Sequence, residues 1–207
     1  MARGVDRRPK EKPPMITTLN GQKAALRKKV RSELKSLSPE KRKGDSEKLC
    51  AKLKEQSFWK NAAAVLFFAS LPEEIDLWPL LGESVKEKII ALPCFDPDQQ
   101  FYTSRQITDL HGEIVPGQFG IREPSADSIE IPLTQLDLVL VPGVAFDRHG
   151  HRLGRGQGFY DRLLEKFRGI KCGIAFAEQV VEAVPVEKRD VKMDFILMPT
   201  RCLKTAQ

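Results

Sequence analysis

The stretch "DLVLVPGVAFDRHGHRLGRGQGFYDRLL" (residues 137–164) contains the pattern that decides the fold. It opens with an apolar run, residues 137–143, that ends at Pro-Gly and is typical of a buried strand. It closes with a helical pattern over residues 157–167, in which Leu163 and Leu164 face one side. A strand, a glycine-rich loop and a helix in this order form the unit from which layered α/β proteins are built.

The rest of the chain continues this alternation. Short apolar runs predict buried strands, and buried strands that alternate with helices favour a parallel sheet. We therefore predict a single-domain layered α/β sandwich, with a mostly parallel sheet flanked by helices, Rossmann-like but without a dinucleotide fingerprint. The domain is expected to span residues 21–207, and residues 99–133 are its least regular part. We expect helices over 21–37, from 38 onward and within 71–81, and further strands at 63–68, 88–95, 170–176 and 194–200.

Composition excludes several classes of protein. The longest apolar run, residues 62–69, is too short for a bilayer, which needs about twenty residues. No secretory signal pattern precedes it, so we expect a cytoplasmic monomer without a membrane partner. The four cysteines form no CxxC pair and predict free thiols, with neither a disulfide framework nor a zinc site.

The first part of the chain is strongly basic. Residues 1–14 carry five basic and two acidic side chains, so half of the net charge of +6 lies there. The segment has three prolines and no apolar period, which predicts a disordered tail over residues 1–20. It could be a nucleic-acid-binding arm, or a solvated extension from a start codon placed too far upstream. We favour the second interpretation and expect no nucleic-acid partner.

Alternating glycines precede the predicted C-terminal helix of the opening stretch. A helix that begins near Gly158 would aim free backbone N–H groups, and a partial positive charge, at this loop. Arg152 and Arg155 would add forked donors that match phosphate oxygens. The alternative is a glycine-rich turn with two solvated arginines. The spacing of Gly154, Gly156 and Gly158 matches neither a P-loop nor a dinucleotide motif, but the combination favours an anion site.

Metal ligands are less clearly marked. Asp161 and Asp194 could each hold Mg²⁺ through water beside bound phosphates, or could form structural ion pairs. The pattern alone favours the structural role. His149 and His151 have no third ligand within sequence reach, so we expect no metal between them.

The stretch "PGVAFDRHGHRLGRGQGFYDR" (residues 142–162) resembles the signature of the 5-formyltetrahydrofolate cyclo-ligase family. The similarity extends to "KAALRKK" (23–29), "FASLPEEIDLWPL" (68–80) and "VPVEKRDVKMDFIL" (184–197), and covers the chain from about residue 22 to 198. The resemblance implies an enzyme that uses ATP and Mg²⁺ to convert 5-formyltetrahydrofolate into 5,10-methenyltetrahydrofolate, with release of ADP and phosphate. Because a formamide oxygen is a poor leaving group, we expect ATP to phosphorylate it and form an imidate-like intermediate.

The resemblance also implies a nucleotide site. Lys23 and Arg27 would hold ATP phosphates, and their four-residue spacing places both on one helical face. Arg155 is the candidate catalytic residue, because phosphoryl transfer depends on alignment and charge neutralisation. The loop residues implied in nucleotide binding are Arg152, Leu153, Gly154, Arg155, Gly156, Gln157, Gly158, Phe159 and Tyr160.

The implied folate site shares part of that loop. Ala69 and Glu74 would contact the pterin and formyl end, with polyglutamylated substrates left open. Asp161 and Asp194 match the magnesium positions of the family. The competing hypothesis is a protein of the same fold that binds folate or nucleotide without turnover. The loop residues implied in folate binding are Arg155, Gly156, Gln157, Gly158 and Phe159.

Overall fold

The computed structural model describes residues 18–98, 101–117, 120–187 and 190–205. Its helices are α1 (Leu19–Lys35), α2 (Pro39–Glu55), α3 (Ser57–Asn61), α4 (Trp78–Ser84) and α5 (Phe159–Lys166), with 3-10 turns η2 (Leu133–Gln135) and η3 (Ala177–Gln179). Its large sheet contains β1 (Ala64–Leu66), β2 (Ile89–Asp96), β3 (Phe101–Ile107), β6 (Leu138–Val141), β9 (Ile170–Ile174), β11 (Phe195–Leu197) and β12 (Cys202–Lys204). Smaller pairings join β4 (Ile114–Pro116) with β5 (Arg122–Pro124), and β7 (Ala145–Asp147) with β8 (Arg152–Leu153) and β10 (Val180–Val181).

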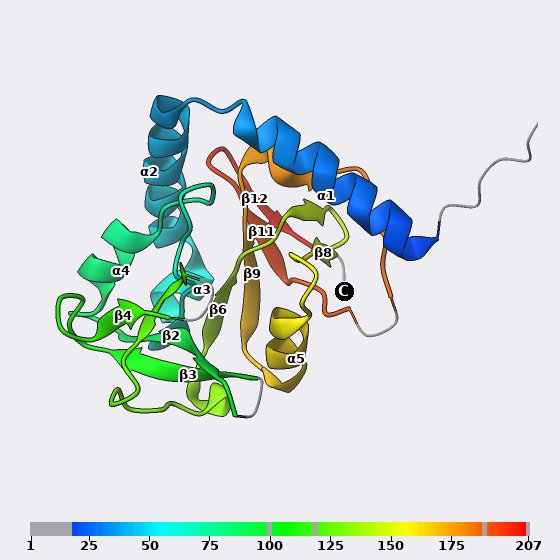
Figure 1. Ribbon diagram of the computed structural model, residues 1–207. Helices are drawn as coiled ribbons and strands as arrows, with labels where there is room; N and C mark the ends of the chain where they lie inside the picture. The colour runs from blue at the N-terminus through cyan, green and yellow to red at the C-terminus, as the bar shows by residue number, and fades with distance from the viewer. Residues whose placement is uncertain (1–17, 99–100, 118–119, 188–189, 206–207) are drawn as a thin grey trace, which may run out of the picture.

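The seven-stranded sheet runs through the centre of the molecule (Figure 1). Its order is β12-β11-β9-β6-β1-β2-β3, in which the five inner strands are parallel and both edge strands antiparallel. Every strand that the sequence predicts is present. The predicted α/β class with a mostly parallel sheet is confirmed.

Side chains on the inner strands alternate between two apolar layers. Val65 of β1 joins a core with residues of α1 to α4, whereas Leu66 joins a second core with Leu163 and Leu164 of α5. Burial on both faces is the reason why these strands read as continuous apolar runs in the sequence.

The predicted boundary of the N-terminal tail is wrong by two residues. Leu19 and Asn20 belong to α1, because the Thr18 side chain accepts a hydrogen bond from Gly21 N at 3.2 Å and caps the helix. Residues 1–17 lie outside the described part of the chain. The second helix begins as predicted, with Ser38 as the cap and Pro39 in the first turn.

The segment 99–133, predicted to be the least regular, contributes two features that position the site. β3 pairs antiparallel with β2 along its whole length. The hairpin of β4 and β5 then packs against β2. The loop after β6 also contains a hairpin, β7–β8, that the sequence did not predict.

Cys50, Cys94, Cys172 and Cys202 are all described and all are free thiols. Burial raises the pKa of each of these thiols, so their reactivity is low. Within the described ranges, no helix combines the length and apolar character that crossing a membrane requires.

Candidate active site

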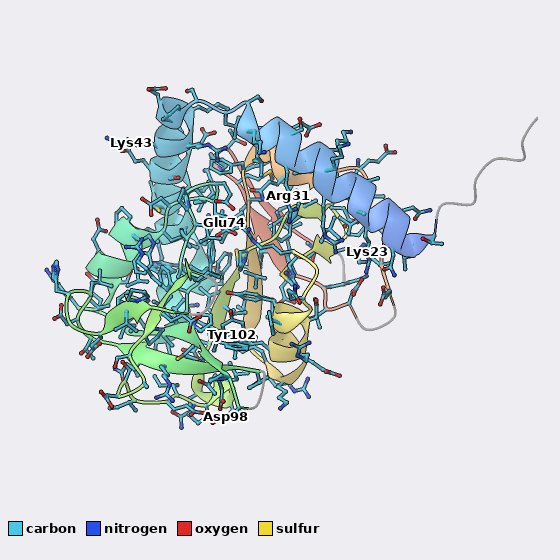
Figure 2. The ribbon with its side chains drawn as sticks, viewed as in Figure 1. Lys23, Arg31, Lys43, Glu74, Asp98 and Tyr102 are labelled. Atoms are coloured by element: carbon cyan, nitrogen blue, oxygen red, sulfur yellow. The ribbon has the colours of Figure 1, made fainter. Side chains whose placement is uncertain are left out.

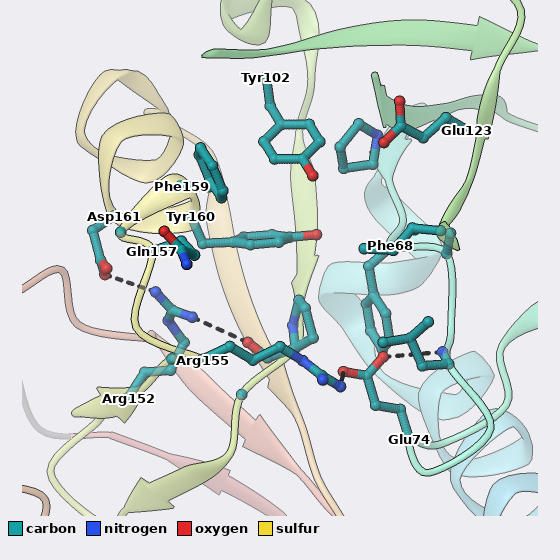
Figure 3. A pocket seen from close by; sticks show the side chains of 18 residues that line it. Phe68, Glu74, Tyr102, Glu123, Arg152, Arg155, Gln157, Phe159, Tyr160 and Asp161 are labelled. Atoms are coloured by element: carbon teal, nitrogen blue, oxygen red, sulfur yellow. Dashed lines mark hydrogen bonds and ion pairs between the residues drawn. The ribbon is translucent and has the colours of Figure 1, made fainter. Parts of the chain in front are cut away.

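A pocket of about 310 Å³ lies at the point where the strand order of the sheet reverses, between the carboxyl ends of β1 and β6 (Figure 3). From β1 the chain continues to β2, toward one edge of the sheet, and from β6 it continues to β9, toward the opposite edge. Ligands of open α/β sheets bind where the strand order reverses in this way. Most of the predicted site residues meet here. Those that line the pocket are Ala69, Glu74, Arg152, Gly154, Arg155, Gln157, Gly158, Phe159, Tyr160 and Asp161.

The glycine loop, residues 154–158, contains two positions whose backbone conformation only glycine adopts easily. Gly156 has a φ of 116° and Gly158 a φ of 67°, both in the positive region. Gly158 is the N-cap of α5, so the predicted helix start is confirmed. Arg27 reaches the loop from α1, where its Nε donates to Gly154 O at 2.8 Å. The N-terminal end of α5, with Gly158, Phe159 and Tyr160 in the pocket lining, therefore borders the pocket beside a cation.

Arg152 is a buried cation beneath this loop. Its side chain is 4% exposed, and its Nη2 donates to Asp161 Oδ1 at 2.7 Å. Nη1 donates to Pro142 O at 3.3 Å, and the guanidinium lies 5.6 Å from the centre of the Tyr160 ring. These contacts fix the guanidinium at one side of the pocket.

Arg155 crosses the pocket mouth to the loop after β1 (Figure 3). Its Nη2 donates to Glu74 Oε1 at 2.8 Å and to Glu73 Oε1 at 3.0 Å. Glu74 Oε2 accepts a hydrogen bond from Leu71 N at 3.1 Å, so both of its oxygens are engaged. Burial raises the pKa of Glu74, although Arg155 opposes the shift. Arg155, predicted to contact both ligands, thus forms an ion pair with Glu74, predicted to contact the folate.

Aromatic rings form another wall. Phe95, Tyr102 and Phe159 contact one another edge to face, with ring centres 5.2 to 5.6 Å apart. Glu123 lies next to them, and its Oε2 accepts from Phe95 N at 3.0 Å. Tyr102 and Glu123 were not among the predicted site residues. The aromatic and β-branched start of residues 101–107 was a strand signal, but nothing in the sequence marked Glu123.

Other predicted residues lie outside the pocket lining. Lys23 is on the first half of α1, away from Glu74 and Tyr102 (Figure 2). Its Nζ pairs with Asp190 at 3.1 Å and with Glu187 at 3.4 Å. Leu153 is buried in β8, and Gly156 lies next to Arg27.

The two predicted magnesium ligands, Asp161 and Asp194, lie in different surroundings. Among the described residues, no three His, Cys, Asp or Glu side chains gather as a metal cluster. Mg²⁺ needs only one or two carboxylates when phosphates supply the remaining ligands. Asp161, 30% exposed in the pocket, fits that requirement. Asp194 lies outside the pocket lining, where its Oδ2 accepts from Lys171 N at 2.8 Å and pairs with Lys171 Nζ, so its role as a magnesium ligand stays a prediction.

Comparison with known proteins identifies the family. The model of the 5-formyltetrahydrofolate cyclo-ligase family matches residues 20–199. The chain belongs to the 5-formyltetrahydrofolate cyclo-ligase family. It is 30% identical to the cyclo-ligase of Escherichia coli, over 83% of this chain and 97% of the relative. It is 28% identical to the cyclo-ligase of Mus musculus, over 87% of this chain and 95% of the relative.

Solved structures agree with this assignment. The NMR structure of the 5,10-methenyltetrahydrofolate synthetase of Aquifex aeolicus is 34% identical, with a TM-score of 0.81. The match covers 89% of this chain and 93% of that one. The synthetase of Mycoplasma pneumoniae, 21% identical with a TM-score of 0.69 over 86% and 98% of the chains, supports the fold alone. The predicted family and the prediction of a cyclo-ligase enzyme are confirmed.

Proposed function

We propose that this cyclo-ligase converts 5-formyltetrahydrofolate and ATP into 5,10-methenyltetrahydrofolate, ADP and phosphate, with Mg²⁺. The observation that best supports the proposal is the composition of the pocket. A glycine loop with two arginines lies on one side, and aromatic rings with the buried carboxylate Glu123 and the partly buried Glu74 lie on the other. A polyanion and a flat nitrogen-rich ring therefore have complementary surfaces within a single space.

The nucleotide phosphates would bind to the glycine loop. Backbone N–H groups from Gly156 to the start of α5 would donate to phosphate oxygens, and Arg152 and Arg27 would add positive charge. Asp161 would hold Mg²⁺, which when bound supplies positive charge beside the phosphates. Lys23 would reach the phosphates only by leaving its present carboxylate partners.

The reaction would proceed in two steps. The formyl oxygen attacks the γ-phosphorus, an O–P bond forms, and the bond from the γ-phosphorus to its bridging oxygen breaks to release ADP. Nitrogen 10 of the folate then attacks the activated formyl carbon. A C–N bond forms, nitrogen 10 loses its proton, and the C–O bond breaks to release phosphate. The first step turns a poor leaving group into a good one.

Side chains of the pocket would orient the two reactants without forming a covalent bond to either of them. Arg155 would leave Glu74 and follow the negative charge as it moves between the γ-phosphoryl and bridging oxygens. Glu74 and the backbone near Ala69 would contact the folate near its formyl end. Phe159 and Tyr160 would cover the ring and exclude water.

Formation of the methenyl product, followed by its absorbance, tests the proposal. We expect product only when 5-formyltetrahydrofolate, ATP and Mg²⁺ are all present, with ADP and phosphate formed in equal amounts. An ATP analogue that cannot transfer its γ-phosphoryl group is the matched control. Binding of both ligands without any product would favour the alternative of a non-catalytic binding protein.

We also propose that the enzyme acts as a cytoplasmic monomer without a nucleic-acid or membrane partner. Size-exclusion chromatography with light scattering should give the mass of a single chain. A comparison of mono- and polyglutamylated substrates in the same assay would establish whether the glutamate tail contributes to binding.

A further inference from the structure

Glu123 presents an unused hydrogen-bond acceptor to the pocket. The residue lies on β5, is 5% exposed and lines the cavity. Its Oε2 accepts from Phe95 N, whereas its Oε1 is buried without a hydrogen-bond partner among the described residues. Buried polar atoms in folded proteins are almost always paired, and an unpaired one needs an explanation. A ligand donor that arrives in the pocket would supply the missing partner.

The fold holds this carboxylate in place. Gly117 lies directly against it, since a Cβ at that position would be 2.4 to 2.8 Å from the Glu123 side chain. Gly117 N donates to Ile121 O at 2.7 Å, which closes the turn between β4 and β5. Figure 3 shows Tyr102 on the same side of the pocket as Glu123, and burial, followed by the charge of Glu123, raises the pKa of Tyr102 to about 12. Glu123 is therefore a positioned group beside the aromatic wall.

No neighbouring cation neutralises Glu123 within the described part of the chain. Arg122 stacks on the Trp78 ring at 3.7 Å, and Arg105 donates to the carbonyls of Ala126 and Ser128. Burial raises the pKa of Glu123, and only the Phe95 N–H opposes the shift. Glu74, a partly buried carboxylate that also lines the pocket, has partners on both oxygens.

The chemistry of the substrate matches this acceptor. A reduced pterin carries two adjacent donors, the 2-amino group and N3–H, at the end of the bicycle opposite to the formyl-bearing nitrogen 5. When the formyl group faces the glycine loop and the Arg152–Asp161 ion pair, the donor edge points to the far side of the pocket. Figure 3 shows Glu123 on that far side, across the pocket from Asp161.

We propose that Glu123 recognises the pterin, with Oε1 accepting a hydrogen bond from the 2-amino and N3–H edge of the folate. Glu74 then serves the other end of the ring and Arg155. The inference rests on the proposed function for the identity of the ligand. It adds a specificity-determining residue that distinguishes an amino-oxo-pyrimidine from rings without this donor edge.

The first test is binding of 5-formyltetrahydrofolate by calorimetry without ATP. Glu123→Gln retains the acceptor for Phe95 N and turns an amide donor toward the ligand's donors. We expect folate to bind about 10- to 100-fold more weakly, as for loss of a hydrogen bond to a charged group. ATP binding should change less than about three-fold. Glu130→Gln, an exposed glutamate on the following segment, is the matched control and should bind folate normally.

A second test modifies the ligand. The 2-desamino-2-methyl analogue of the substrate lacks one donor, so wild type should bind it about 10-fold or more weakly than the parent. Glu123→Gln should discriminate little between the two ligands, whereas Glu74→Gln should discriminate as wild type does. Equal discrimination by Glu123→Gln and wild type would overturn the proposal, as would loss of discrimination in Glu74→Gln instead. Should Glu123→Gln fold poorly, Glu123→Asp replaces it in the same cycle.

These outcomes separate the inference from the proposed function. Wild type that binds the folate but forms no product contradicts the function and leaves the binding cycle fully informative. Wild type that forms product, with a Glu123→Gln variant that binds folate normally, contradicts only the role of Glu123.

Discussion

At the scale of single residues, the two arginines of the pocket differ in how firmly the protein holds their side chains. Arg152 is fixed by Asp161 and by a backbone carbonyl, so its position is set before any ligand binds. Arg155 is half exposed and, within the described part of the chain, pairs with Glu73 and Glu74 at the surface, so an exchange of partners costs little. Only interactions that strengthen in the transition state raise turnover, and a movable forked donor can supply one.

Arg155→Ala should therefore lower kcat more than it weakens ATP binding. We expect a fall in kcat of about 10²–10³-fold, or about 2.7–4 kcal/mol, typical of one lost transition-state donor. Arg155→Lys should restore only part, because an ammonium group lacks the planar fork. Steady-state kinetics separate the effects. A higher KM for ATP with an unchanged kcat would show that Arg155 only holds the nucleotide.

Glu123 should also affect how stability depends on pH. Its pKa is raised in the folded state, so the ionised carboxylate destabilises the fold above that pKa. The penalty disappears as the pH falls through the folded value toward the unfolded value near 4.5. Glu123→Gln should thus be at least as stable as wild type at neutral pH and lose this advantage in acid. Urea unfolding at several pH values checks this, and a variant that is less stable at neutral pH contradicts it.

At the scale of elements, the β7–β8 hairpin and the loop that follows it contain glycines with different tasks. Gly150 turns the hairpin with a φ of 86°, and a Cβ there would lie 2.5 Å from Met193 O. Gly156 has a positive φ, and a Cβ there would meet the Arg27 guanidinium at 3.8 Å, the nearest contact among the described residues outside its chain neighbours. The first glycine is required by packing, whereas the second has room for a Cβ beside Arg27.

The two alanine variants should consequently differ. Gly150→Ala adds backbone strain and overlap, and we expect a loss of about 2–6 kcal/mol of unfolding free energy. Gly156→Ala should lose about 1–3 kcal/mol from strain alone, and should bind ATP more weakly because the added methyl group obstructs close approach to the backbone. Urea unfolding and nucleotide titration measure both. Similar losses of unfolding free energy in the two variants would contradict the conclusion that Gly150 is required by packing and Gly156 is not.

The elements also show what could be predicted from sequence. The glycine loop was predictable because its residues are contiguous between a strand and a helix. Tyr102 and Glu123 were not, because they reach the pocket only through the antiparallel pairing of β3 and the packing of the β4–β5 hairpin. The spacing of Lys23 and Arg27 correctly placed them on one helix, but no spacing rule brings Lys23 to carboxylates more than 160 positions away.

At the scale of the whole molecule, the fold and the charge distribution can be considered separately. The family match spans residues 20–199, and the sheet and its covering helices are built from within that range, apart from α1, which begins at Leu19, and the edge strand β12. Half of the net positive charge belongs to residues 1–14, which precede the family match. The basic character of the chain therefore says little about the pocket.

Deletion of residues 1–14 should leave turnover and melting temperature nearly unchanged, because these residues carry few apolar side chains for a core. Thermal unfolding and the product assay check both quantities. A large loss of either would show that the segment packs on the domain or shapes the site. Salt-dependent binding to random duplex DNA that the deletion abolishes would instead support a nucleic-acid-binding arm.

The ion pair between Arg155 and Glu74 has a consequence for the order in which ligands bind. It ties the nucleotide side of the pocket to the folate side, so the first ligand must separate the two side chains before it can use one of them. The second ligand then meets a partner that is already released and binds more tightly. Nucleotide and folate should therefore bind with positive cooperativity, and each should raise the affinity of the other by the same factor.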